Sequence, residues 1–193
     1  MRTRYIVLTA AAIITAAAWL FTTHQSAPRV ITPVAQPAAD AVPSAIPVPM
    51  CAATEPGQPM HLIGRVFDEH NKPLPKASVI AYSTDNTGLY VPRGSSTRTP
   101  RINAVAVTDA NGWFHFTTIK PGPYPDTDDP MHIHLHIDAA VHKHMYRTLW
   151  FEDDPRLTPA KRRAIDAETR IVPLVKRDDG TLEARCDIRL EGA

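Results

Sequence analysis

The feature that most constrains the fold is a seven-residue stretch in which apolar residues and histidines alternate strictly. It covers residues 131–137 and has the sequence MHIHLHI. In an extended strand, successive side chains point to opposite faces, so the four apolar residues would share one face and His132, His134 and His136 the other. An amphipathic helix would instead show an apolar period near 3.6 residues. We therefore expect a half-buried β-strand with a row of imidazoles on its outer face.

Short apolar or alternating segments of the same kind recur from Cys51 to the end of the chain. Turn-forming residues separate several of them, as at 109–112 and 178–180. Thr158 followed by Pro159 is typical of a helix start, and we expect one short helix that reaches about Ala167. The pattern predicts an all-β fold, a β-sandwich with a short helix, over residues 51–193. The expected strands cover residues 61–67, 77–83, 104–108, 113–118, 131–137, 145–151, 171–175 and 181–190, and 86–103 is a long functional or covering loop.

The first 50 residues have a different composition. Residues 1–26 begin with Arg2 and Arg4, followed by an uncharged apolar run over 5–21. This order is typical of a signal peptide or an N-terminal membrane anchor, and in both cases the remainder is exported. Residues 27–50 are rich in Pro and Ala, which favours an extended linker. We expect a periplasmic or extracellular protein that could be tethered to a membrane through residues 5–21.

Charge and cysteine content limit the classes of partner and scaffold that we expect. The formal net charge of +1 gives no electrostatic reason to expect a nucleic-acid partner. Two cysteines are too few for a disulfide-rich scaffold. Export would permit a disulfide, and we expect a bridge between Cys51 and Cys186 rather than two unpaired thiols.

The histidine row and a nearby tyrosine are the candidate functional residues. Histidines at positions i and i+2 of a strand are roughly 6–7 Å apart at Cα and can converge on one metal ion. The alternative is a solvated strand face that is rich in histidine, and His142 and His144 are expected at the surface or behind the ligands. Tyr124 lies between two prolines that restrict its backbone, which suits either a structural tyrosine or a functional one.

A longer stretch around these residues resembles a known family, the intradiol ring-cleavage dioxygenases, which include the catechol and protocatechuate dioxygenases. The stretch starts at Asp109, contains Gly112, Phe114 and Phe116, and continues through Pro121-Gly122-Pro123-Tyr124-Pro125 to His132-x-His134. Weaker similarities lie at 64–68, Gly88-x-Tyr90, 149–155 and 186–190. The similarity covers the chain from about Cys51 to its end.

The resemblance implies a β-sandwich that holds one mononuclear, non-haem Fe(III) ion. Its ligands would be Tyr90, Tyr124, His132 and His134, with Tyr124 and His132 axial. Ferric iron is a hard cation that suits anionic oxygen, and a bound cation lowers the pKa of a phenol strongly. The implied reaction opens a catechol-type ring with O2 and gives a muconate-type dicarboxylate. Tyr124 would be the catalytic residue, because its phenolate would leave the metal and accept a substrate proton.

Two positions depart from the family pattern. The family's usual arginine three residues before the first ligand histidine is Asp129 here, and its glutamine before the Leu-Trp-Phe-Glu strand is Thr148. An aspartate would repel a catecholate. A compensating positive charge could come from one of four arginines, at Arg93, Arg98, Arg101 or Arg147.

Two other classes of function compete with the dioxygenase. The residues Gly64-x-Val66-x-Asp68 and Asp109-x-x-Gly112-x-Phe114 also resemble non-catalytic transthyretin-like or carboxypeptidase-regulatory-like β-sandwich modules. Such a binding module would not need both tyrosines together with both histidines. The third class is a zinc or copper site that uses the histidines without tyrosinate. His136 has no ligand role in the family and is expected behind the site or at the surface.

Overall fold

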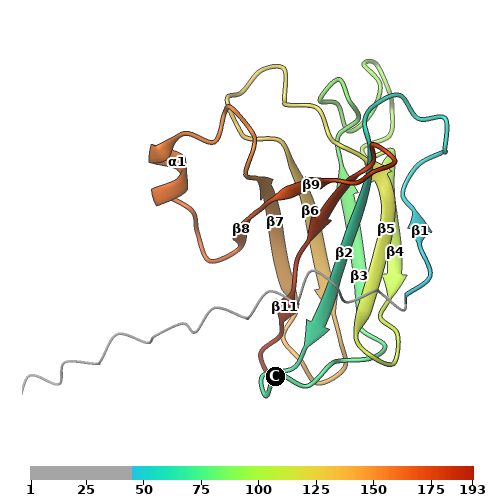
Figure 1. The fold of residues 1–193 in the computed structure, drawn as a ribbon, viewed down its shortest axis with the longest axis vertical. Helices are drawn as coiled ribbons and strands as arrows, with labels where there is room; N and C mark the ends of the chain where they lie inside the picture. The colour runs from blue at the N-terminus through green and yellow to red at the C-terminus, as the bar shows by residue number, and fades with distance from the viewer. Residues whose placement is uncertain (1–44) are drawn as a thin grey trace, which may run out of the picture. The chain divides into compact units, whose positions relative to one another are not determined.

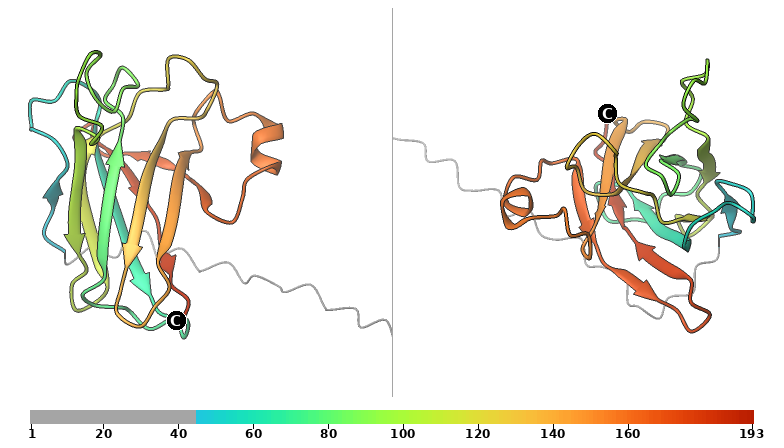
Figure 2. Two further views of the ribbon diagram at one scale, coloured as in Figure 1. Left: turned by 180° about the vertical axis from the view of Figure 1, so that it is seen from behind. Right: turned by 90° about the horizontal axis from the view of Figure 1, so that it is seen from above.

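A computed structural model describes residues 45–193 and shows two β-sheets packed face to face with one short helix (Figures 1 and 2). The six-stranded sheet has the order β1-β5-β2-β10-β9, and β11 also pairs with β2; the five-stranded sheet has the order β4-β3-β6-β7-β8. This is the predicted all-β sandwich. Its elements are β1 (Val48–Pro49), β2 (Pro59–Phe67), β3 (Ser78–Ser83), β4 (Ile102–Val107), β5 (Trp113–Ile119), β6 (His132–Asp138), β7 (Met145–Phe151), α1 (Pro159–Arg163), β8 (Thr169–Val172), β9 (Leu174–Lys176), β10 (Leu182–Arg185) and β11 (Ile188–Arg189).

The alternating stretch forms β6, and its apolar face packs in the core as expected. Ile133, Leu135 and Ile137 are fully buried, whereas the histidines between them are half-buried. Burying one such aliphatic side chain contributes roughly 1.5–3 kcal/mol relative to leaving it exposed. From the opposite sheet, the core receives Phe114 and Phe116 of β5. The face of β6 that carries the histidines is therefore the outer face of the five-stranded sheet.

Two expected strands are each divided in the structure. The segment 171–175 breaks at Pro173, which has no N–H to donate; β8 pairs with β7 in one sheet and β9 pairs with β10 in the other. The segment 181–190 breaks after Arg185, where the Asp187 carboxylate accepts the hydrogen bond of the Arg65 backbone N–H at 3.3 Å. The helix begins at Pro159 with Thr158 as its N-cap, as predicted, but ends at Arg163.

The predicted disulfide is wrong. Cys51 and Cys186 are both free thiols. Cys51 follows β1 at one edge of its sheet and Cys186 follows β10, with strands β5 and β2 between them. Three strand spacings amount to about 14 Å, whereas the Cα atoms of a disulfide lie within about 7 Å.

The N-terminal predictions fall mainly outside the described residues. The signal peptide or anchor over 1–26 and most of the linker over 27–50 lie there, so export stays a prediction from the sequence. The last linker residues join the sandwich, because β1 pairs with β5 and Met50 is buried. Within residues 45–193, no helix has the length and apolar character needed to cross a membrane.

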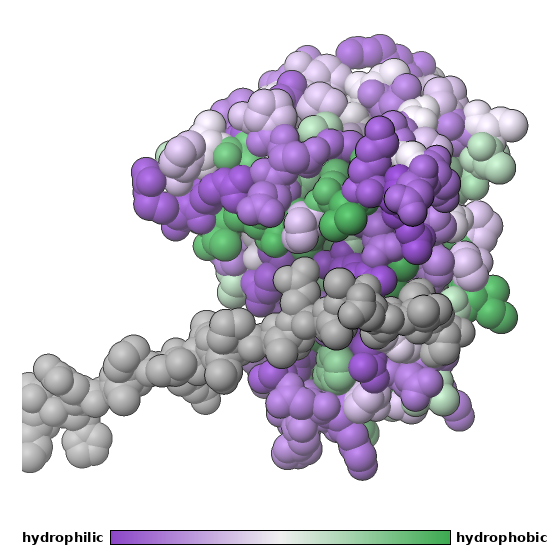
Figure 3. All heavy atoms as spheres, viewed as in Figure 1, coloured by the Kyte–Doolittle hydropathy of each residue, from purple (hydrophilic) through white to green (hydrophobic). Residues whose placement is uncertain are grey.

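The loops that follow β3 and β5 lie together at one end of the sandwich, away from the C-terminus (Figures 1 and 2). The first covers residues 84–101 and carries Tyr90; the second covers residues 120–131 and carries Tyr124. His132 is the first residue of β6, immediately after the second loop. Hydrophilic residues cover most of the face seen in Figure 3, with apolar residues in small groups.

Candidate metal centre

Strand pairing places the two predicted histidine ligands in the middle of a polar and aromatic surface. On the outer face of the five-stranded sheet, His134 lies opposite Tyr82 of β3 and Thr148 of β7. The ring centroids of His132 and His134 are 4.6 Å apart. The period-two alternation of β6 accounts for this proximity, because it brings both rings to one face.

The two tyrosines come from the loops and meet the histidines at the start of β6. The hydroxyl of Tyr124 lies 2.9 Å from Nε2 of His132 and forms a short hydrogen bond with the hydroxyl of Tyr90. The Tyr90 ring centroid is 6.5 Å from that of His134. All four side chains named from the sequence therefore lie in one half-buried cluster, although they come from three separate segments of the chain.

Two glycines allow the tyrosine-bearing loops to touch. A Cβ atom at Gly88 would lie 2.0 Å from the carbonyl oxygen of Pro123, and one at Gly122 would lie 2.4 Å from the carbonyl oxygen of Asn86. Gly88 also has a φ of 84°, a conformation that favours glycine. Larger residues at these positions would separate the loops and, with them, Tyr90 from Tyr124.

Hydrogen bonding directs Nε2 of His132 towards Tyr124. Its Nδ1 lies 2.7 Å from the carbonyl oxygen of Pro130, which can only accept, so Nδ1 carries a proton and Nε2 is the nitrogen that the neutral ring would offer to a cation. Burial lowers the pKa of His134 to about 4, with smaller contributions from His132 and His136, so this imidazole is neutral at pH 7. His134 therefore has the protonation state that metal binding requires.

Burial raises the pKa of both phenols. For Tyr90 the hydrogen bond to Tyr124 adds to the effect of burial, and for Tyr124 the negative charge of Asp129 adds to it. Without a nearby cation, both hydroxyls would keep their protons at pH 7. A bound multivalent cation reverses this balance because it stabilises the phenolates. Two oxygen and two nitrogen donors in contact thus fit a hard, trivalent metal ion.

A zinc or copper site of the usual composition is less well supported. In the described part of the chain, there is no group of three or more His, Cys, Asp or Glu residues that could hold a metal ion. Without the tyrosines, the cluster offers only His132 and His134. The tyrosines are therefore needed to complete a ligand set.

Tyr82 is a residue of the site that the sequence reasoning missed. Its ring stacks on His134 with centroids 4.8 Å apart and planes inclined by 26°, and its centroid lies 6.0 Å from that of Tyr90. The stack restricts rotation of the His134 ring. In the sequence, Tyr82 is only an aromatic residue at one of the alternating positions of β3. This pattern is too common in strands to single it out.

Asp154 and Arg156 are two further contributors that the sequence reasoning missed. The buried Asp154 carboxylate accepts hydrogen bonds from the backbone N–H groups of Met131, next to His132, and of Arg156. Arg156 in turn donates to the carbonyl oxygens of Tyr124 and Thr127 at 3.0 and 3.1 Å. Both residues lie in the turn after β7. This turn therefore holds the start of β6 and the Tyr124 loop in place.

The two departures from the family pattern lie at the site. Asp129 is exposed on the Tyr124 loop, where its carboxylate accepts a hydrogen bond from Thr127, and its charge raises the pKa of Tyr124. The Thr148 hydroxyl lies 3.3 Å from Nδ1 of His134. Asp129 therefore gives the rim a negative charge, and Thr148 contacts a candidate ligand directly.

The four arginines considered as replacements for the family's arginine have different positions. Arg101 forms ion pairs with Glu55 and Asp85, and Arg147 donates to the carbonyl oxygens of Tyr146 and Ala167. In the strand pairing, Arg147 is one residue out of phase with Thr148 and so faces away from the histidines. Arg93 and Arg98 are exposed in the Tyr90 loop.

The three remaining histidines of the segment 132–144 lie outside the four-residue cluster. His136 contacts Tyr82 at 3.5 Å and the ring of Tyr146 at a centroid distance of 4.4 Å, so it lies behind the site. His144 is exposed near Asp138. The side chain of His142 is only 8% exposed and lies 3.4 Å from Glu69. His142 follows the C-terminal end of β6, whereas the cluster lies at its N-terminal end.

Comparisons with known proteins identify the family to which the chain is similar. A family model described as Dioxygenase matches residues 33–192. The chain is 30% identical over 112 residues to the protocatechuate 3,4-dioxygenase beta chain of Burkholderia cepacia, covering 52% of this chain and 48% of that protein. It is 28% identical over 117 residues to the hydroxyquinol 1,2-dioxygenase of Corynebacterium glutamicum, covering 52% and 38%.

Solved structures give the same result. The dioxygenase domain of a dioxygenase carbohydrate-binding protein fusion from Streptomyces sp. SirexAA-E is 25% identical, with a TM-score of 0.62, covering 79% of this chain and 93% of that one. Catechol 1,2-dioxygenase from Pseudomonas arvilla C-1 is 28% identical, with a TM-score of 0.63, covering 76% and 56%. The chain thus spans about half the length, or less, of the curated relatives it matches.

Proposed function

This chain belongs to the intradiol ring-cleavage dioxygenase family, and from that membership we propose that it opens a catechol-type aromatic ring with O2 to a muconate-type dicarboxylate. The reaction breaks the ring bond between the two hydroxyl-bearing carbons and adds both atoms of one O2 to the substrate, so each of these carbons becomes a carboxyl carbon. One mononuclear, non-haem Fe(III) ion would be bound by Tyr90, Tyr124, His132 and His134. The observation that carries this proposal is the contact of these four side chains in one half-buried cluster.

The metal ion, when bound, would supply positive charge that holds the substrate as a catecholate and prepares its ring for reaction with O2. Tyr90 and His134 are the more restrained pair. The Tyr90 phenol is the more buried of the two tyrosines, and the His134 ring is held between Tyr82 and Thr148. These two residues would stay in place throughout the reaction.

Tyr124 is the residue best arranged to move a proton. Its hydroxyl contacts both Tyr90 and His132, while its backbone carbonyl is held by Arg156. The side chain can therefore turn away while the loop stays fixed. In the proposed reaction, the Tyr124 phenolate oxygen accepts the proton of one substrate hydroxyl, which keeps the charge of the site balanced as the catechol binds.

The binding-module alternative is the weaker candidate. A β-sandwich that only binds a partner has no need for two half-buried phenols clustered with two imidazoles. The family match also covers the two loops and the strand that carry all four residues.

The deciding experiment combines spectroscopy with oxygen uptake. Protein loaded with Fe(III) is expected to show a broad visible band from tyrosinate-to-iron charge transfer and to consume one O2 per catechol converted. A panel of catechols with neutral, anionic and cationic substituents would identify the preferred ring. Iron-loaded protein that is colourless would contradict the ligand assignment, and coloured protein that consumes no O2 with any member of the panel would contradict the activity.

A further inference from the structure

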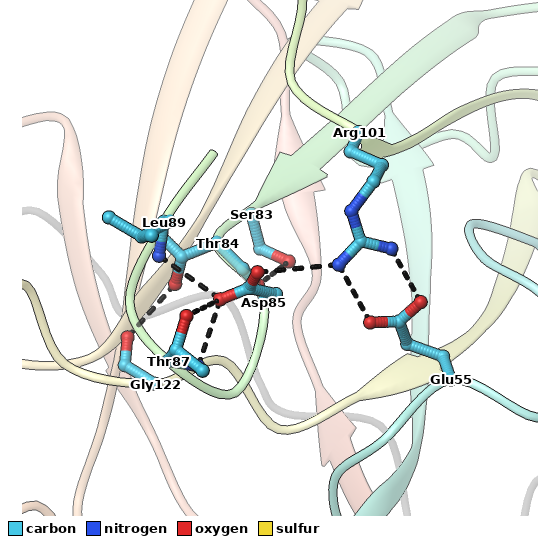
Figure 4. Close-up of polar contacts among 8 residues, drawn as sticks. All are labelled: Glu55, Ser83, Thr84, Asp85, Thr87, Leu89, Arg101 and Gly122. Carbon is cyan, nitrogen blue, oxygen red and sulfur yellow. Dashed lines mark hydrogen bonds and ion pairs between the residues drawn. The ribbon is translucent and has the colours of Figure 1, made fainter. Parts of the chain in front are cut away.

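The side chain of Arg101 lies between two acidic residues, Glu55 and Asp85 (Figure 4). Its guanidinium forms a bidentate ion pair with Glu55, at 2.5 and 2.8 Å, and a further contact of 3.3 Å with Asp85. Its backbone N–H donates to the carbonyl oxygen of Tyr90 at 2.8 Å. One residue thus connects the segment after β1, the turn after β3 and the residue that carries a candidate metal ligand.

Asp85 extends this connection into the turn that precedes Tyr90. One of its carboxylate oxygens accepts hydrogen bonds from the backbone N–H and hydroxyl of Thr87 and from the backbone N–H of Leu89 (Figure 4). Its backbone N–H donates to the carbonyl oxygen of Leu89 at 2.9 Å. The carboxylate therefore fixes the shape of the turn over residues 85–89, and the other carboxylate oxygen is the one that Arg101 holds.

The same turn is bonded to the loop that carries Tyr124. The carbonyl oxygen of Asp85 accepts a hydrogen bond from the backbone N–H of Gly122 at 2.7 Å. The hydroxyl of Thr84 donates to the carbonyl oxygen of Gly122 at 2.9 Å (Figure 4). A shift of the turn would therefore change the separation between the Tyr90 and Tyr124 hydroxyls, which are in contact.

We propose that Arg101 is a positioning residue for the metal centre, and that its joint pairing with Glu55 and Asp85 sets the spacing of the two tyrosine ligands. This inference rests on the proposed function. Arg101 is the cation that Glu55 and Asp85 share, and without it two like charges would be left side by side. Their repulsion would move the turn, which has no strand pairing of its own to resist it.

The arrangement makes a specific prediction about double variants. Arg101→Met leaves two uncompensated carboxylates, whereas Arg101→Met combined with Glu55→Gln leaves only one. If the repulsion moves the turn, the second substitution should partly restore what the first one removes. Residues that share an ion pair show such non-additive effects, whereas independent ones do not.

The test uses the full chain loaded with Fe(III) and measures two quantities other than activity: the visible tyrosinate band and the iron affinity in competition with a chelator. We expect Arg101→Met to bind iron about 10–100-fold more weakly and to show a shifted or weaker band. Arg101→Lys keeps the charge but not the bidentate geometry, so it should lie between wild type and Arg101→Met.

Arg177→Met is the matched control. The Arg177 side chain is 43% exposed and contacts Glu183, which is 10% exposed, whereas Arg101 is 40% exposed and Glu55 is 9% exposed. Glu183 belongs to β10 in the other sheet. Arg177→Met should leave both the band and the iron affinity unchanged.

Each outcome of this test supports or overturns the positioning role of Arg101. A normal band and normal iron affinity in Arg101→Met, or equal losses in Arg101→Met and Arg177→Met, would overturn the inference and leave the proposed function intact. If Arg101→Met does not fold, Arg101→Lys should still weaken iron binding, and an unchanged affinity in Arg101→Lys would overturn the inference. Wild-type protein without a tyrosinate band would overturn the proposed function and this inference together.

Discussion

Tyr124 is the residue at which most contacts of the candidate site meet. Its hydroxyl joins Tyr90 to His132, and its backbone is held by Arg156. The loop to which it belongs is anchored by two cations, Arg156 and Lys161. Changes at this residue should therefore affect metal binding and proton transfer together.

Tyr124→Phe removes one phenolate from the proposed ligand set and the group that accepts the substrate proton. We expect the visible band of the iron-loaded protein to lose intensity and turnover to fall by at least about tenfold, since a positioned acid or base commonly contributes 10²–10⁴-fold. Absorption spectra and oxygen uptake measure the two effects. Tyr146→Phe, an exposed tyrosine of β7, is the control. Unchanged turnover in Tyr124→Phe would remove Tyr124 from the mechanism.

Asp129 is the residue whose charge least suits an anionic substrate. It is exposed on the Tyr124 loop, so its interaction with a bound anion is screened by solvent. Asp129→Arg reverses that charge, and at the rim we expect a change of about 1 kcal/mol, or roughly fivefold tighter binding of a carboxylate-bearing catechol. Steady-state KM values for neutral and anionic catechols measure this. Identical KM values in wild type and variant would mean that the charge of Asp129 does not act on the bound substrate.

At the scale of elements, strands supply the histidines and loops supply the tyrosines. The strand positions are fixed by pairing in register with two neighbours, whereas the loop positions depend on close backbone contacts at Gly88 and Gly122. The loops are therefore the part of the site most sensitive to small changes of volume.

Gly88→Ala and Gly94→Ala form a matched pair that tests this dependence. Both glycines have positive φ, 84° and 80°, so an alanine is strained at either position. Only at Gly88 would the new Cβ meet another loop; nothing lies within 4 Å at Gly94. We expect Gly88→Ala to lower the free energy of unfolding by at least about 1 kcal/mol more than Gly94→Ala, and to weaken iron binding where Gly94→Ala does not. Urea unfolding and chelator competition are the measurements. Equal effects of the two substitutions would show that contact between the loops is unimportant.

At the scale of the whole molecule, buried histidines link stability to pH. In the six-stranded sheet, Nδ1 of His61 lies 2.7 Å from Nε2 of His115. Burial lowers both pKa values, with the charge of His61 adding to the shift of His115, whose pKa falls to about 4. The half-buried Asp187 has the opposite effect, since partial burial raises its pKa to about 6.

The sign of the effect follows from proton binding. The ordinary pKa of histidine is 6.5, so between pH 6.5 and about 4 the unfolded chain holds a proton that folded His115 does not. This contribution to stability is complete above pH 6.5 and is lost as the pH falls towards 4. The raised pKa of Asp187 acts in the other direction. As the pH falls, folded Asp187 binds a proton before the unfolded chain does, so its contribution to stability increases. We expect the metal-free protein to lose stability between pH 7 and pH 5.

His115→Gln isolates the histidine contribution. The variant should show a smaller change in the free energy of unfolding between pH 7 and pH 5 than wild type, as measured by urea unfolding. His70→Gln, at a highly exposed histidine, should behave like wild type. A pH dependence in His115→Gln as steep as that of wild type would contradict the assignment.

Much of the fold and of the candidate site could be predicted because the relevant signals are local in sequence. The alternation over 131–137 determines which side chains of β6 face the core, whatever the neighbouring strands are. The spacing of His132 and His134, and the prolines around Tyr124, likewise act over a few residues. These signals were enough to predict the all-β sandwich and the histidine row, whereas the set of four residues that the structure brings together, Tyr90 included, was implied by the resemblance to the intradiol dioxygenases.

The tertiary structure decided what depends on contacts between distant segments. Only the order of strands shows that Cys51 and Cys186 are separated, and only the change of sheet at Pro173 divides a segment that looks like one strand. The roles of Tyr82 and Asp154 beside the site, and of Arg101 in bridging two acids, likewise arise from pairing across the fold. A sequence pattern specifies the direction of a side chain within its own strand, but its partners are set by how the whole chain packs.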